Sequence, residues 1–159
     1  MPRSAAGNLL ADLLSQELQA VRSFILLLRR EQSLLAEGAS EALTTLAEEK
    51  FRAACQLSSL AESRETQLAA LKLPAGRAGM DAWNTSADGT SSRDNWHQLL
   101  QLAVEARALN EANGKLIAIH LQHYQQGINV LTAALDQAAT YGPDGQQRTG
   151  ISGRSRGSV

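Results

Sequence analysis

A long stripe of apolar and small residues runs through the C-terminal half of the sequence and predicts one helix over residues 92–141. Its members recur at alternating steps of three and four, as on one face of a helix. At ~1.5 Å per residue, such a helix reaches roughly 75 Å. Asn110 and Asn113 fall on the stripe, where buried amides usually fix the register of packing. The other members are Trp96, Leu99, Ala103, Ala106, Ile117, His120, Tyr124, Gly127, Leu131, Ala134, Ala138 and Tyr141.

Two shorter helices are predicted before it, over residues 9–37 and 41–71. The first has heptad-spaced apolar residues with Gln32 in the one polar position, and Gly38 is suited to end it. Pro74 ends the second, because proline interrupts helical hydrogen bonding. These patterns predict an all-α fold, an antiparallel three-helix bundle or coiled coil with a long C-terminal helix. The apolar positions of the first helix are Leu14, Leu18, Val21, Ile25, Leu28 and Leu35.

The second helix has a looser apolar face, which includes Leu46, Phe51 and Leu68. Lys50 and Arg64 fall beside this face. We expect both to extend their charged ends outward to solvent while their methylene groups cover the apolar surface.

Two segments have no apolar period and are rich in small and polar residues, namely 72–90 and 142–159. The first is predicted as a long loop and the second as a disordered tail. Trp83 is the exception in the loop, and we expect it to fold back over one end of the bundle. Residues 1–141 are therefore predicted to form one helical domain.

The last helix is longer than the helices available to cover it. If it runs antiparallel to helix 41–71 from its own start, it is covered only to about residue 122. Past that point an apolar stripe continues, rimmed by glutamines, and such a stripe is typical of a surface that binds a partner. A break at Gly114 or Gly127 would instead let the last segment fold back on the bundle. We refer to Tyr124, Ile128, Leu131 and Leu135 as the partner stripe.

Composition and charge narrow the class of protein. Aromatic residues make up only 4% of the chain, so the core must be built from Leu and Ala, which favours helix. The net charge of −1 gives no electrostatic basis for binding nucleic acid. Cys55 is the single cysteine and cannot form an internal disulfide, which fits a reducing cytoplasm. No signal peptide and no membrane-spanning run is visible, so a cytoplasmic location is expected.

The sequence offers little for catalysis or cofactor binding. His120 and His123 are three residues apart on a helix, but no third metal ligand follows at helical spacing, so no metal site is expected. Cys55 lacks a basic neighbour that would activate its thiol. The turn at 142–145 follows a helix rather than preceding one, so it does not form a phosphate loop. We therefore expect neither an enzyme nor a cofactor.

Two motifs resemble those of a known family. The run Asn110-Glu-Ala-Asn113-Gly114-Lys-Leu116-Ile117 is similar to the Asn-x-x-Asn-Gly-x-Leu stretch of the FlgN family of flagellar export chaperones. The run Tyr141-Gly142-Pro143-Asp144-Gly145-Gln146, with its basic Ser- and Gly-rich end, resembles that family's tail. The likeness covers most of the chain. In the first motif, Asn110, Asn113, Gly114 and Leu116 are expected to be structural, the amides setting register and the glycine allowing close approach of helices.

The resemblance implies a cytoplasmic, α-helical chaperone. Such a protein binds the C-terminal regions of flagellar hook-associated proteins, prevents premature assembly and delivers them to the type III export gate. The partner stripe is then expected to hold the client. The tail tyrosine of the family, which matches Tyr141, is implicated in docking on the cytosolic platform of the gate. Here Tyr141 is expected to act together with Gly142, Asp144 and Gly145.

Two other interpretations remain open from the residues. The chain could be a helical adaptor or coiled-coil oligomer without an export role, in which the partner stripe pairs with its own copy. A metal protein that uses His120 and His123 is the more distant alternative. The first interpretation requires a stable dimer, whereas the chaperone interpretation predicts a monomer or a weak homo-oligomer.

Overall fold

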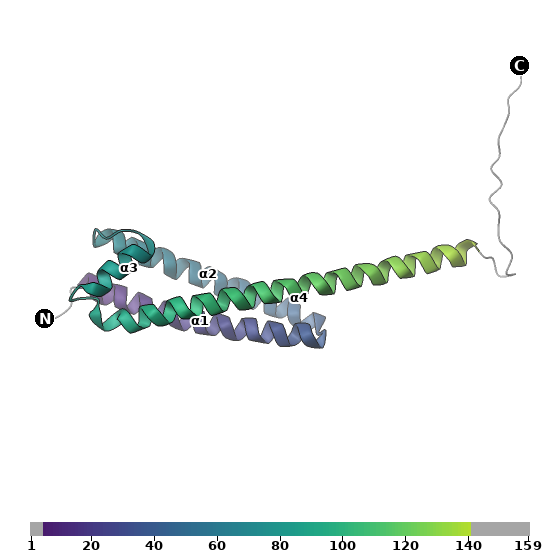
Figure 1. Ribbon diagram of the computed structural model, residues 1–159, viewed down its shortest axis with the longest axis horizontal. Coiled ribbons are helices and arrows are strands. Elements are labelled where there is room, and N and C mark those ends of the chain that lie inside the picture. Colours follow the sequence, from purple (N-terminus) through teal and green to yellow (C-terminus); the bar gives the residue numbers. More distant parts are fainter. Residues whose placement is uncertain (1–4, 141–159) are drawn as a thin grey trace, which may run out of the picture. The chain divides into compact units, whose positions relative to one another are not determined.

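The computed structural model describes residues 5–140 of the chain, and the elements formed by these residues are all helices, with no strand among them. The all-α prediction is therefore confirmed. The three long helices lie close to their predicted bounds, and α4 is the longest of them (Figure 1). The elements are α1 (Ala5–Glu37), α2 (Ser40–Ala70), α3 (Gly76–Thr85), a 3-10 turn η1 (Thr90–Ser92) and α4 (Arg93–Thr140). The predicted tail, 142–159, lies outside the described residues.

The prediction of a loop over residues 72–90 is wrong, because α3 occupies its middle. Met80 and Trp83 are three residues apart on this helix and both are buried. The carboxylate of Glu65 on α2 accepts a hydrogen bond of 2.8 Å from the backbone N–H of Gly76, at the start of α3. An acceptor at this position satisfies one of the unpaired donors of a helix N-terminus. Trp83 thus packs into the core as expected, but from a helix.

The described chain divides into two units, residues 5–117 and residues 118–140, and α4 contributes to both. The first unit contains α1, α2, α3, η1 and the first half of α4. The second unit is a single stretch of helix. The single domain predicted over residues 1–141 stays a prediction.

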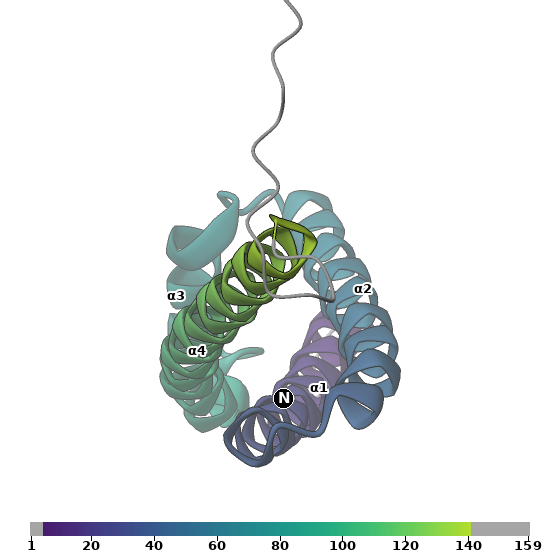
Figure 2. The same cartoon turned by 90° about the vertical axis from the view of Figure 1, so that its right-hand side faces the viewer.

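Contacts between side chains give the directions of the helices in the first unit. Along α1, Glu17 pairs with Arg64 of α2 and Glu31 pairs with Lys50, so α2 runs antiparallel to α1. Figure 2 shows α1 between α2 and α4. Two further pairs join α1 to α4 in increasing order along both helices, which makes these two helices parallel. They are Arg22 with Gln98 at 2.8 Å and Arg29 with Glu105 at 2.6 Å.

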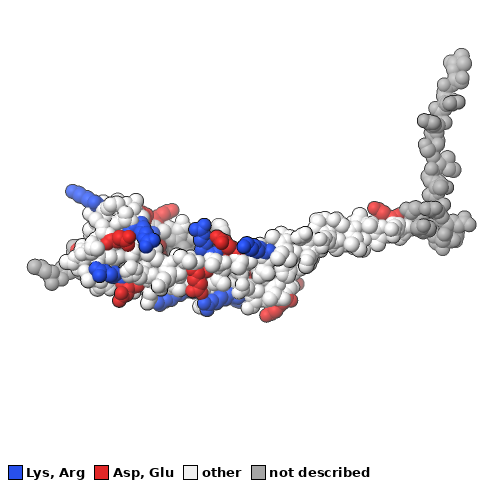
Figure 3. All heavy atoms as spheres, viewed as in Figure 1, with Lys and Arg blue, Asp and Glu red and all other residues white. Residues whose placement is uncertain are grey.

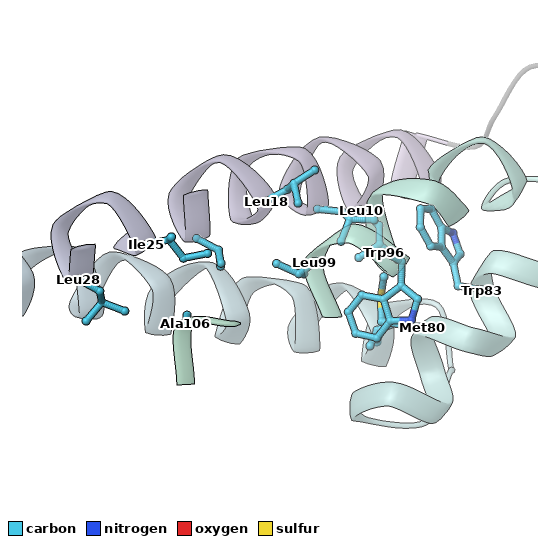
Figure 4. Packing of buried hydrophobic residues seen from close by; sticks show 12 residues of the cluster. Leu10, Leu18, Ile25, Leu28, Met80, Trp83, Trp96, Leu99 and Ala106 are labelled. Atoms are coloured by element: carbon cyan, nitrogen blue, oxygen red, sulfur yellow. The ribbon is translucent and has the colours of Figure 1, made fainter. Parts of the chain in front are cut away.

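The core of the first unit is built mainly from α1. Every apolar residue of the predicted α1 pattern is buried. On α2 only Leu46 and Leu68 are fully buried, and Phe51, predicted on the apolar face, is 70% exposed. Figure 4 shows the side chains of α1, α3 and α4 gathered between the helices. The buried cluster consists of Leu10, Leu14, Leu18, Val21, Ile25, Leu28, Leu68, Met80, Trp83, Trp96, Leu99 and Ala106.

Lys50 and Arg64 do not extend outward to solvent as predicted. Lys50 Nζ lies 3.1 Å from a carboxylate oxygen of the buried Glu31. Arg64 lies 3.5 Å from the carboxylate of the buried Glu17. Charges that leave water require partners, so each basic side chain turns inward to the acidic residue that α1 buries.

Candidate partner-binding surface

The partner stripe lies in the second unit, and all four of its side chains are exposed. Tyr124, Ile128, Leu131 and Leu135 expose between 56% and 62% of their surface. They follow one another at steps of four, three and four, so they form one face of the helix. Large apolar side chains in a row on one helix face are unusual for an unpartnered surface. Their exposure was expected from the helix lengths; their role in binding stays a prediction.

The helix around the partner stripe is almost uncharged. Between residues 118 and 140 the only Asp, Glu, Lys or Arg is Asp136. This stretch of α4 is white over most of its length in the space-filling view (Figure 3). Five of its polar residues are amides, and Gln125 donates a 3.0 Å hydrogen bond to Asn129 one turn later. A partner would therefore meet an apolar surface bordered by uncharged hydrogen-bonding groups.

Leu121 extends the same face and was not included in the predicted stripe. It is 63% exposed and lies three residues before Tyr124. The alternation of three and four residues, continued backwards from Tyr124, would have found it.

Of the two asparagines in the family motif, one is buried and the other is exposed. Asn113 is fully buried, and its side-chain N–H groups donate 2.8 Å hydrogen bonds to the carbonyl oxygen of Leu28 and to the carboxylate of Glu31. Asn110 is exposed, so the expectation that both amides lie in a packed seam is wrong for it. The buried residues of α4 form a narrower strip than the predicted seam, consisting of Trp96, Leu99, Ala106 and Asn113.

The remaining motif residues have less specific surroundings. Gly114 is exposed, and a Cβ added there would meet open space, so the expected close approach of another helix at this glycine is wrong. Leu116 is half-buried. The gate-docking residues of the tail lie outside the described residues; they are Tyr141, Gly142, Asp144 and Gly145.

A cleft of about 490 Å³ opens among α1, α2 and α4 within the first unit. Most of its lining is apolar, because Val21 and Phe24 of α1, Leu57 of α2 and Leu99 of α4 contribute to it. Glu17, Arg64 and Trp96 provide its polar lining, together with Ser58. The other lining residues are Ala61, Leu100, Ala103 and Ala106.

The polar part of the cleft is electrostatically unusual. The guanidinium of Arg64 lies over the Trp96 ring, 5.4 Å from its centroid, and 3.5 Å from the carboxylates of both Glu17 and Glu65. Burial raises the pKa of Glu17 above its ordinary value; the charge of Arg64 opposes this shift and that of Glu65 adds to it. Glu17 Oε2 and Arg64 Nε are buried, and neither has a hydrogen-bond partner among the described residues.

The described residues contain no group of three His, Cys, Asp or Glu side chains that could hold a metal ion. His120 is half-buried and His123 is exposed on the second unit. Cys55 is an exposed thiol on α2. Over residues 5–140, none of the helices combines the length and the apolar character that crossing a bilayer requires.

Comparison with known proteins adds a relationship that covers most of the chain. A family model described as FlgN protein matches residues 5–149. Two curated relatives, both named flagella synthesis protein FlgN, come from Yersinia enterocolitica, one of them from a serotype O:8 / biotype 1B strain. Each is 27% identical over 137 residues, which is 85% of this chain and 86% of the relative. No solved structure matches the chain.

Proposed function

The chain belongs to the FlgN family, whose members are chaperones and not enzymes, and from this premise we propose its specific task. It is a cytoplasmic export chaperone that binds the C-terminal regions of flagellar hook-associated proteins, the components of the filament junction. It keeps these clients soluble and unassembled, and it delivers them to the type III export gate.

The exposure of the partner stripe is the observation that carries this proposal. A helix of the second unit presents Tyr124, Ile128, Leu131 and Leu135 to solvent at heptad spacing. An amphipathic helix of a client can lay its own apolar face along such a row, as in other helix–helix recognition. Because both surfaces leave water, association is driven by burial of apolar area.

A chaperone that hands over its client also needs a limited affinity. A client region that is poorly folded before assembly orders only when it binds, and this ordering offsets part of the interaction energy. The complex is therefore specific enough to prevent premature assembly and weak enough to release at the gate. Tyr141, with Gly142, Asp144 and Gly145 of the tail, contacts the cytosolic platform of the gate in this proposal.

The test of the client site uses two substitutions in the partner stripe, Ile128→Asp and Leu131→Asp. Each places a carboxylate where an apolar contact would form, and we expect roughly tenfold weaker binding of a hook-associated protein from the same genome, measured by co-purification and calorimetry. Val130→Asp is the matched control. Val130 is 71% exposed on the same helix but lies about 100° around it from Leu131.

The control separates a site from a general effect of charge. Val130→Asp should bind the client as well as the unsubstituted chain does. If both stripe variants retain full client binding, or if Val130→Asp loses as much binding as they do, the assignment of the stripe is refuted.

A further inference from the structure

The partner stripe alone does not determine where along it a client helix binds. Leu121 and the four stripe residues are all apolar or aromatic and follow one another at steps of three and four. A client helix shifted by one heptad therefore meets equivalent positions. In coiled coils, charges beside the seam or a polar residue within it exclude such shifts. Residues 118–135 contain no Asp, Glu, Lys or Arg, so any feature of α4 that fixes the client lies outside this stretch.

The spacing of the stripe continues towards the N-terminus of α4. Counting back from Leu121, steps of four, three and four residues reach Ile117, Gly114 and Asn110. Positions on one helix are related by its helical repeat, and α4 is helical over this whole range, so the three residues share the face of the stripe. All three are exposed, Ile117 by 37% of its surface. We refer to Asn110, Gly114 and Ile117 as the stripe extension.

The extension provides what the stripe lacks. Asn110 is the first polar side chain on the shared face, and its amide is exposed to solvent, whereas the neighbouring Asn113 is buried and bonded to α1. A Cβ added at Gly114 would meet open space, so packing among the described residues does not require a glycine there. A glycine inside a helix lowers its stability but lets another backbone approach closely.

We propose that the client helix continues from the partner stripe onto the stripe extension, where Asn110 fixes its register. This inference rests on the proposed function, because its partner is the same hook-associated protein. The amide of Asn110 hydrogen-bonds a polar group of the client helix, and a client shifted by one heptad loses this bond. Gly114 leaves room for the backbone of that helix one turn later.

The extension also sets the length of the client helix. Leu121 to Leu135 covers about two heptads, and isolated helices of that length are marginal in water. Asn110 and Leu135 are 25 residues apart, which corresponds to nearly four heptads and roughly 38 Å of helix. The client therefore supplies an amphipathic helix of about this length, with a polar residue near the end that faces Asn110.

The test measures binding of the full-length chain to an unassembled hook-associated protein from the same genome by calorimetry. Gly114→Leu fills the space left for the client backbone, and we expect the dissociation constant to rise at least about tenfold. Asn110→Ala removes the amide and should raise the dissociation constant about threefold. Ala108→Leu and Gln101→Ala are the matched controls, because both residues are exposed and lie at least about 120° around α4 from the residue that they match. They should bind the client like the unsubstituted chain.

The melting temperature of the free chain separates an effect on binding from an effect on folding. Leucine has a higher helix propensity than glycine and Gly114 is exposed, so Gly114→Leu should melt no lower than the unsubstituted chain. Weaker client binding by a variant of equal or higher stability does not result from unfolding. Gly114→Ala, which adds a single methyl group, replaces Gly114→Leu if the larger side chain lowers the melting temperature.

The stripe variants Ile128→Asp and Leu131→Asp, measured alongside, distinguish failure of this inference from failure of the proposed function. If they lose client binding while the Gly114 variant binds as tightly as Ala108→Leu, the extension is refuted and the partner stripe stands. If they bind the client normally, the stripe is refuted and its extension with it. Loss of binding by the stripe variants and by the Gly114 variant, with both controls unaffected, is the expected result.

Discussion

Asn113 connects three helices through a single carboxylate. From α4 its amide donates to Glu31 of α1 and to the Leu28 carbonyl oxygen, while Lys50 of α2 binds the same Glu31. All three polar side chains lie inside the first unit with little exposure. A one-turn shift of α4 along α1 would separate the Asn113 amide from Glu31 and from the Leu28 carbonyl oxygen, so the contact fixes the register between these two helices.

Asn113→Ala removes both hydrogen bonds and leaves the buried Glu31 carboxylate with Lys50 as its only donor among the described residues. We expect the free energy of unfolding to fall by about 1–3 kcal/mol, measured by denaturant titration. Asn110→Ala is the control, because Asn110 has the same side chain on the same helix but is exposed. It should change stability by less than about 0.5 kcal/mol. Equal losses in the two variants would contradict a register role for Asn113.

Glu17 gives the first unit a pH-dependent stability. Because its pKa is raised by folding, the native state favours the protonated carboxyl. The contribution of Glu17 to the free energy of unfolding is fully present below its ordinary pKa of 4.5 and is lost as the pH rises through the raised pKa. Glu17→Gln resembles the protonated form and does not lose this contribution. The melting temperature of the variant minus that of the unsubstituted chain should therefore increase as the pH rises from about 4 to about 7.

The comparison needs a carboxylate without this environment. Glu62→Gln, on the exposed side of α2, is the matched control for replacing a carboxylate by an amide. A Glu17→Gln difference in melting temperature that stays constant with pH would show that burial of Glu17 has no effect on its titration.

At the scale of single residues, the sequence predicts which residues are buried better than it predicts which residues they contact. The heptad pattern of α1 identified Leu14 to Leu35 as core, because apolar periodicity depends only on the helix itself. The same pattern could not show that Lys50 and Arg64 turn inward. Their direction depends on Glu31 and Glu17 of α1, and a partner on another helix is known only when the register between the helices is known.

The glycines of α3 and α4 show how the same substitution can act in opposite directions. A Cβ at Gly79 would overlap the backbone carbonyl of Pro74, where α3 folds back close to the chain before it. A Cβ at Gly114 would meet open space on the exposed face of α4. The first glycine permits a close approach of backbone, whereas the second only lowers the helix propensity.

We therefore expect Gly79→Ala to lower the free energy of unfolding by about 1–3 kcal/mol. Gly114→Ala should raise it by about 0.5–1 kcal/mol, because alanine restricts the unfolded chain and favours helix. Thermal unfolding followed by circular dichroism measures both. Stabilisation by Gly79→Ala, or destabilisation by Gly114→Ala, would contradict the packing described here.

At the scale of elements, long helices were predictable and the short one was not. The apolar repeats of α1, α2 and α4 extend over many turns, so their period is clear. Helix α3 spans only ten residues and contains two glycines, which weaken its helical propensity. It is stabilised by contacts from other elements, including Glu65 at its start and the 3.0 Å hydrogen bond from the Trp96 ring N–H to Asp81.

The two units of the molecule should differ in local stability. The first unit buries a cluster of large side chains, whereas no side chain between residues 118 and 139 is fully buried. A helix without tertiary packing opens readily, because most helical stability in proteins comes from burial of an amphipathic face. We expect amides of residues 118–140 to exchange with deuterium much faster than those of α1, measured by mass spectrometry.

The same deuterium exchange experiment is then repeated with the client bound. When the partner stripe is covered, exchange over residues 118–140 should slow while exchange in α1 stays unchanged. Protection in the free chain that already equals that of α1 would contradict an unpartnered helix.

At the scale of the whole molecule, the lengths of the predicted helices were the best guide to which part of the chain is exposed. The mismatch in length predicted that the last third of the chain would expose Ile128 and Leu131, and both are exposed. The cleft could not be predicted, because its size depends on the spacing of α2 and α4 rather than on their patterns. Its polar part is set by Arg64, whose position beside Trp96 depends on three-dimensional packing.

The near absence of charge along residues 118–140 also limits how a bound client could be released. Ionic strength screens attractions between charges, but it leaves apolar contacts intact or strengthens them. In the proposed complex, therefore, added salt would not detach a hook-associated protein from Ile128 or Leu131. Release of the client would instead require a competing apolar surface that displaces it from the partner stripe.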